Sequence, residues 1–299
     1  MSSVNPIRRL LTCCSSDGQY EDHAQPRLRI ATQHTRGSRW NTAPAMDVST
    51  GSDLPSPPPY SVFDPHPADC QCAIHVHKQH PIRPTVVEAF QSQGCSSCPP
   101  TNTYLLSLLT QADPNILVLD YHVTTWDHLG WQDTFSLKAA DDYQREYARA
   151  RGTTRVYTPQ VVVNGVAEGT GNSKGKLEQL IKDASLTASA GWPWLLFSKV
   201  DEGVLIREAS AATAATRRTG RVIEVVYDPT LREVETQSGE NVGKVLPYRN
   251  VVKSLEIIGD WMGDEEVVPV QPRNLDDRTE RVLIVQQGIG GVIIGVARI

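Results

Sequence analysis

The feature that most constrains the fold of this chain is a pair of cysteines, Cys95 and Cys98, that lies between a strand pattern and a helix pattern. Residues 85–90 are rich in β-branched side chains, which favours a strand. Leucines at helical spacing over 105–109 predict a helix, and the apolar run 116–119 predicts a second strand. Together they predict a right-handed βαβ unit with parallel strands and two sulfur atoms at the first strand-to-helix junction.

Two cysteines separated by two residues can close a small disulfide ring or share a metal ion. A helix start carries a partial positive charge, which favours redox chemistry and a thiolate on Cys95. We expect Cys95 to be the more exposed sulfur and to attack a partner disulfide, and Cys98 to resolve the mixed disulfide. Pro99 and Pro100 also allow the helix to begin after the pair, which favours the Cys98 thiolate at least as much. The assignment of the two sulfurs therefore stays open. The prediction requires both to be uncovered and close enough to join.

A proline is predicted to face the cysteine pair from another part of the chain. Thr158 and Pro159 directly precede the strand pattern at 160–163. In a thioredoxin-like fold a cis proline stands before such a strand and faces the dithiol, and cis bonds are essentially confined to proline. We expect the backbone of Thr158 to pair with an extended substrate peptide beside Cys95.

Three more side chains are candidates to support the pair. Burial of Glu88 would raise its pKa and make it a proton acceptor for Cys98, and the alternative is a solvated carboxylate. The segment 121–133 follows the second strand, where an α/β sheet places its ligands. His122 is a candidate proton shuttle and Trp126 a candidate cleft residue. For the tryptophans in this segment simple packing is slightly favoured.

The rest of the chain contains patterns of both kinds. Residues 133–151 and 173–189 favour helices, and the Asn164-Gly165 pair between two β runs predicts a hairpin. From residue 194 onward, strand patterns alternate with turn residues.

These patterns divide the chain into three segments. Residues 1–83 lack apolar periodicity and are rich in Pro, Ser, Thr and Gln, which predicts a disordered tail. Residues 84–190 predict an α/β thioredoxin-like domain, and 191–299 a mainly antiparallel β domain.

The run from Val87 to Pro100 resembles the signature of a family of thioredoxin-like proteins of unassigned function from bacteria and fungi, which typically contains E-L-F-T-S-Q-G-C-S-S-C-P-P. The resemblance covers about 85–299 and implies a thioredoxin-like domain with an appended β domain, but no reaction. Bacterial members are often exported, whereas we expect no signal peptide here. Further matching runs are 121–123, 126–127, 129–131, 133, 157–160, 239–243, 250–252 and 285–286.

A metal-like composition occurs in the predicted tail. Cys70 and Cys72 lie close to His75, His77 and His80. Zinc is bound by four such ligands, but commonly with wider cysteine spacing. An accidental cluster is favoured, so we predict no metal.

Two further motifs in the tail point to partners. Pro57 and Pro58, with Tyr60, fit a PPxY ligand for a WW domain, and a proline-rich linker is about equally favoured. Cys13 and Cys14 follow two arginines and are candidates for acylation and peripheral membrane attachment. A cytoplasmic location remains the expectation.

Charge and composition exclude several classes of function. The formal net charge is −5, which argues against general binding of nucleic acid. No apolar run reaches the roughly 18 residues of a membrane span. There is no phosphate-binding glycine loop and no flavin or nicotinamide fingerprint, so we predict no cofactor and expect electrons to come from another thiol.

The sequence therefore favours a thiol–disulfide oxidoreductase that uses Cys95 and Cys98 on a protein or small-molecule disulfide. The alternatives are a non-catalytic thioredoxin-like binding module recruited through its tail, and a metal-binding protein.

Overall fold

The computed structural model describes residues 84–188, 195–209, 218–273 and 276–299. All of them belong to one compact unit, Ala68–Ile299. The predictions for 1–83 lie outside the described residues: the disordered tail, the acylated Cys13 and Cys14, the PPxY ligand and the metal-like cluster.

Strands outnumber helices in the described residues. The helices are α1 (Cys98–Thr110), the 3-10 helix η2 (Thr124–Leu129), α2 (Lys138–Ala150) and α3 (Lys174–Ala188). The strands are β1 (Thr85–Gln91), β2 (Ile116–His122), β3 (Gln160–Val163), β4 (Ala167–Gly169), β5 (Leu195–Val200), β6 (Gly203–Glu208), β7 (Gly220–Asp228), β8 (Arg232–Glu235), β9 (Val245–Tyr248), β10 (Val251–Trp261), β11 (Glu266–Val268), β12 (Glu280–Gln286) and β13 (Ile293–Arg298). None of the helices in these ranges combines the length and apolar character that a membrane span needs.

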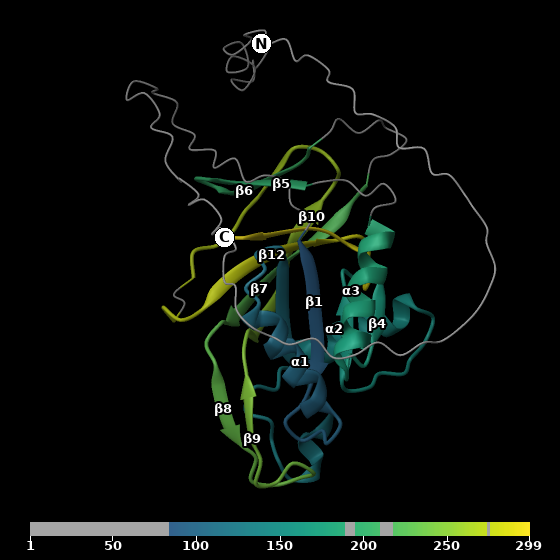
Figure 1. Cartoon of the computed structure of the whole chain (residues 1–299). Helices are drawn as coiled ribbons and strands as arrows, with labels where there is room; N and C mark the ends of the chain where they lie inside the picture. Colours follow the sequence, from purple (N-terminus) through teal and green to yellow (C-terminus); the bar gives the residue numbers. More distant parts are fainter. Residues whose placement is uncertain (1–83, 189–194, 210–217, 274–275) are drawn as a thin grey trace, which may run out of the picture. The chain divides into compact units, whose positions relative to one another are not determined.

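Eight strands form one mixed sheet, in the order β13-β12-β7-β10-β2-β1-β3-β4 (Figure 1). β2 pairs in parallel with both β1 and β10, and the other neighbours are antiparallel. The predicted parallel pair around α1 is confirmed. The predicted hairpin is also confirmed, since Asn164 and Gly165 both take the positive φ that a tight turn between β3 and β4 requires.

The fold-class prediction is wrong. Strands from 84–190 and from 191–299 share the eight-stranded sheet, so the described residues are mainly β rather than an α/β thioredoxin-like domain followed by a β domain. The physical reason is the edge of β2, which would otherwise present unpaired backbone groups. The Asp120 N–H donates to the Asn250 carbonyl at 3.0 Å, and the Asn250 side chain donates to Val118 at 2.7 Å. The domain boundaries proposed from sequence stay predictions.

The two faces of β1 and β2 are covered by different helices. On one face, Val87, Ala89 and Val118 pack with Leu105 of α1 and Leu177 of α3. We call this the α1 face. On the other, the α2 face, side chains of β1 and β2 pack with α2, and their cluster extends to β7 and β12. The members from these elements are Val86, Phe90, Leu117, Leu119, Tyr121, Ala140, Tyr143, Tyr147, Ile223, Val225, Tyr227, Val282 and Ile284.

Two smaller sheets complete the unit. The sheet β11-β6-β5 packs on β7, β12 and β13 through Ile206, Val222 and Leu283, among others. β8 and β9 form a hairpin beside α1 (Figure 1). The Asn102 side chain of α1 donates to the Pro247 carbonyl of β9 at 2.5 Å. This contact brings the hairpin next to the start of α1, where the cysteines lie.

Candidate functional site

The cysteine pair lies at the junction of β1 and α1, as predicted. Cys95 closes a turn after β1, because its N–H donates to the Ser92 carbonyl at 3.2 Å. Cys98 is the first residue of α1, Ser97 is the N-cap, and the prolines occupy the first helical turn, where a missing N–H costs nothing. Cys95 thus lies in the loop ahead of the helix. Both thiols are free.

The surroundings give the two sulfurs opposite proton affinities. The hydrogen bond from the Cys98 thiol lowers the pKa of Cys95 to about 6, against the opposing effect of burial, and Ser97 and Thr158 add to the lowering. Burial, the hydrogen bond with Cys95 and the charge of Cys95 all raise the pKa of Cys98. The arrangement therefore favours Cys95 as the attacking thiolate and Cys98 as the group that keeps its proton.

The expectation of uncovered sulfurs is wrong. Cys95 is 0% exposed and Cys98 1% exposed, although Ser96 and Ser97 between them are exposed. The cover comes from parts of the chain distant in sequence, described below. This burial counts against the predicted enzyme, because a partner disulfide can reach Cys95 only when part of this cover moves.

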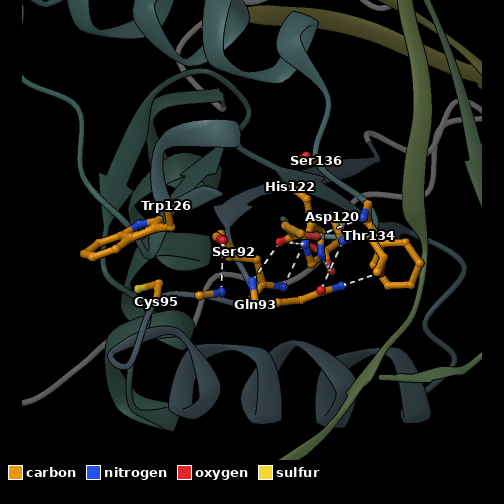
Figure 2. Close-up of polar contacts among 12 residues, drawn as sticks. Ser92, Gln93, Cys95, Asp120, His122, Trp126, Thr134 and Ser136 are labelled. Atoms are coloured by element: carbon orange, nitrogen blue, oxygen red, sulfur yellow. Dashed lines mark hydrogen bonds and ion pairs between the residues drawn. The ribbon is translucent and has the colours of Figure 1, made fainter. Parts of the chain in front are cut away.

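Two residues distant in sequence, Thr158 and Trp126, lie beside Cys95. The Thr158–Pro159 bond is cis, and the Thr158 carbonyl lies 3.7 Å from the Cys95 sulfur and accepts a hydrogen bond from the Ser97 hydroxyl at 3.3 Å. The Trp126 indole N–H donates to the Thr158 hydroxyl at 2.8 Å. Figure 2 shows Trp126 and Cys95 together at one end of the site. These contacts hold η2 and the Thr158 segment against the cysteine loop.

His122 lies deeper on the same face of the sheet, between two carboxylates (Figure 2). Its Nδ1 donates to Asp133 at 2.7 Å and its Nε2 to Asp120 at 3.3 Å, and all three side chains are almost fully buried. Burial alone would lower the pKa of His122, but the charges of Asp133 and Asp120 raise it to about 10. Both ring nitrogens are engaged, so the geometry favours a fixed cation over the predicted proton shuttle.

The buried ion cluster connects to the cysteine loop through Gln93. Asp133 accepts the Gln93 backbone N–H at 2.7 Å, and the Gln93 side chain accepts from the Trp131 indole at 2.9 Å. The charge of His122 opposes the burial of Asp133 and lowers the pKa of that carboxyl overall. Asp133 therefore stays an acceptor and fixes the chain two residues before Cys95.

Glu88 is buried as one alternative predicted, but on the opposite face from the cysteines. Its neighbours Val87 and Ala89 point to the α1 face, whereas its carboxylate accepts hydrogen bonds from Tyr121, at 3.2 Å, and Tyr147. Burial raises the pKa of Glu88 to about 7 against the opposing hydrogen bonds of Tyr147, Tyr143 and Tyr121. The structure therefore does not bring Glu88 to Cys98, and the predicted proton transfer between them has no contact to carry it.

Sequence reasoning missed the loop between β8 and β9, which lies against the cysteines. The Asn241 amide donates to the carbonyls of Gln93 and Cys95, and the Glu240 carboxylate accepts the Ser96 N–H at 3.1 Å. A signal was present, because 239–243 is one of the runs that support the family resemblance. Within the described residues, His, Cys, Asp and Glu form no cluster that could hold a metal ion.

Comparisons with known proteins identify a family and a fold. A family model described as a protein of unknown function (DUF1223) matches residues 86–286. The crystal structure of protein AGR_C_4864 from Agrobacterium tumefaciens is similar with a TM-score of 0.55 and 22% identity, over 72% of this chain and 93% of that chain. HBP35 of Porphyromonas gingivalis gives a TM-score of 0.45 and 12% identity, over 73% and 74%. The search of curated proteins returned no match. The first similarity shows a shared fold alone.

Proposed function

The chain belongs to the DUF1223 family, whose function is unknown, and we propose that it is a thiol–disulfide oxidoreductase that uses Cys95 and Cys98 on a protein or small-molecule disulfide. The observation that carries the proposal is the unequal pair. Cys95 lies in the loop ahead of α1 with the Ser97 hydroxyl at 3.3 Å from its sulfur, and its pKa, lowered to about 6, favours the thiolate, whereas burial raises the pKa of Cys98 in the first turn of the helix.

The reaction follows from this inequality. The Cys95 thiolate attacks one sulfur of the partner disulfide, a mixed disulfide forms, and the first partner thiolate leaves. The Cys98 thiol then passes its proton to a departing thiolate and attacks the Cys95 sulfur. A Cys95–Cys98 disulfide forms and the second partner thiol is released. Two electrons pass from the protein to the partner, and another thiol must return them.

The test uses the full chain with Cys13, Cys14, Cys70 and Cys72 replaced by serine, so that only the proposed pair carries thiols. We expect this protein to reduce insulin or a glutathione mixed disulfide, with a dithiol reductant regenerating it. Cys95→Ser should abolish turnover. Cys98→Ser should trap the mixed disulfide on Cys95, visible as added mass. Reductant-driven turnover that is absent with every disulfide tested, or retained in the Cys95→Ser variant, would contradict the proposal.

Burial of both sulfurs favours a second candidate, a binding module whose cysteines do not exchange. In that case the cysteines stabilise the loop through their mutual hydrogen bond. The same experiment separates the candidates, because a binding module would form no trapped mixed disulfide in the Cys98→Ser variant.

A further inference from the structure

Asn241 lies in the loop between β8 and β9 and is 0% exposed, although its neighbours Glu240 and Val242 are exposed. A polar side chain buried in an exposed loop needs partners that offset its lost hydration. Asn241 has three, and two of them belong to the cysteine loop.

The amide of Asn241 spans the backbone of the cysteine loop. Its nitrogen donates to the carbonyl of Gln93 and to the carbonyl of Cys95, each at 2.8 Å. Its oxygen accepts from the Lys244 ammonium at 2.8 Å. An ammonium can only donate, so Lys244 fixes which end of the amide faces the loop.

The loop that carries Asn241 is itself closed by backbone hydrogen bonds. The Gly243 N–H donates to the Thr236 carbonyl at 2.7 Å, and the Lys244 N–H donates to the Asn241 carbonyl at 3.0 Å. Gly243 has a φ of +75°, a conformation that residues with a Cβ rarely adopt. The amide is therefore presented from a loop with a defined shape.

A second residue of this loop holds the next peptide group. The Glu240 carboxylate accepts the Ser96 N–H at 3.1 Å. Together Asn241 and Glu240 bind three backbone groups on both sides of Cys95. Both residues are far from the cysteines in sequence. These contacts therefore exist only when the β8–β9 hairpin is docked beside the cysteine loop.

We propose that Asn241 is a positioning residue for Cys95, which acts through the Gln93 and Cys95 carbonyls to hold the Cys95 sulfur beside Cys98, Ser97 and Thr158. This inference rests on the proposed function, in which Cys95 is the attacking group. The side chain touches neither sulfur, so its effect passes through the backbone. Without the two donors, the loop loses the contact that keeps the sulfur within reach of its hydrogen-bond partners.

The decisive variant is Asn241→Leu, which keeps about the same side-chain size and removes both donors without adding a charge near Cys95. The probe is iodoacetamide, and the readout is the pH profile of Cys95 alkylation in the full chain with the four tail cysteines replaced by serine. We expect the midpoint to rise from about 6 by about one pH unit or more. Val242→Ala, on the same loop with Val242 60% exposed, is the matched control and should leave the midpoint unchanged.

A second variant keeps the inference falsifiable if Asn241→Leu fails to fold. Asn241→Ala also removes both donors without changing the charge and adds no bulk to the loop, so a rise of the midpoint in the same direction is expected. A purely structural role would lower the thermal midpoint of unfolding without moving the alkylation midpoint. An unchanged alkylation midpoint in either folded variant would overturn the inference.

The two proposals can fail separately. If the protein reduces no disulfide but the alkylation midpoint moves in Asn241→Leu, the oxidoreductase proposal fails and the positioning role is supported. If the protein reduces disulfides and the midpoint does not move, only the positioning role is overturned.

Discussion

The same two strands carry a buried polar cluster on each face, and the two clusters hold charge differently. On the α1 face, Asp120 and Asp133 flank His122 and connect to the cysteine loop. On the α2 face, Glu88 lies among tyrosine hydroxyls. Both are almost completely removed from water. The carboxylates beside the histidine face a cation, whereas the Glu88 carboxylate has neutral hydrogen-bond donors.

The comparison shows that burial acts on both carboxyls and that the partner decides whether its effect is overcome. Burial alone would raise the pKa of both Asp133 and Glu88, yet His122 lowers that of Asp133, and the hydroxyls around Glu88 leave its pKa at about 7. Arg221 also favours the charged form of Glu88, but its own ion pair is with Glu146. The α1 face therefore holds fixed charges and the α2 face a group that titrates near neutrality.

The largest expected effect is on the α1 face. His122→Ala leaves two buried carboxylates without their cation, and we expect a loss of about 3–5 kcal/mol in the free energy of unfolding, measured with urea at pH 6. The raised pKa of His122 means that its contribution is complete below pH 6.5 and is lost as the pH rises through about 10. His128→Ala, at an exposed histidine, is the control and should change stability by less than about 0.5 kcal/mol. A loss below about 1 kcal/mol for His122→Ala would show that the cluster is not held by charge.

The next effect tests the α2 face. Since the folded-state pKa of Glu88 lies above its ordinary value of 4.5, folding takes up a proton, and stability falls as the pH rises from 4.5 through about 7. Glu88→Gln removes this dependence and should be more stable than the wild type above pH 7, by up to about 3 kcal/mol. Urea unfolding at pH 5 and pH 8 measures the difference. Glu178→Gln, at an exposed glutamate, should show no such gain, and equal pH slopes in Glu88→Gln and the wild type would refute the assignment.

The smallest effect refines the same face. Tyr147 donates to Glu88 and is the hydrogen-bond partner that lowers its pKa most. Tyr147→Phe should therefore extend the pH-dependent loss of stability above pH 7, because the folded-state pKa of Glu88 rises while its unfolded value does not, and cost about 1–2 kcal/mol at pH 8. The midpoint of urea unfolding, followed across pH, measures both changes. A shift of the loss to lower pH would mean that Tyr147 does not stabilise the carboxylate.

Local patterns predicted the elements that form the cysteine site. The β-branched run before Cys95, the leucines after Cys98 and the Asn164-Gly165 pair all correspond to observed elements. Each of these elements is determined by residues close to it in sequence, through the spacing of apolar side chains or the residues of a tight turn. The Thr158–Pro159 bond is cis, and the Thr158 carbonyl lies 3.7 Å from the Cys95 sulfur.

Long-range contacts could not be predicted in the same way. Asn250 pairs with the edge of β2, and Asn241 binds the Cys95 carbonyl, and each is more than 100 residues from its partner. The position of Glu88 could not be predicted for a similar reason. Both faces of β1 are buried, so the alternation of residues does not tell which face packs against which helix. The expectation of exposed sulfurs failed in part for this reason, since Thr158, 63 residues away, lies beside the Cys95 sulfur together with its local neighbour Ser97.

The pairing of β2 with β10 has a consequence for biosynthesis. A growing chain that has reached α3 already contains Cys95, Cys98 and the strand β2, but neither Asn241 nor the strand that closes the β2 edge. Since chains emerge from the N-terminus, the open edge of β2 and the Gln93 and Cys95 carbonyls lack these partners together until β10 is made. Docking of the β8–β9 hairpin and of β10 then supplies both sets of partners, so the cysteine loop and the sheet edge are completed late and together.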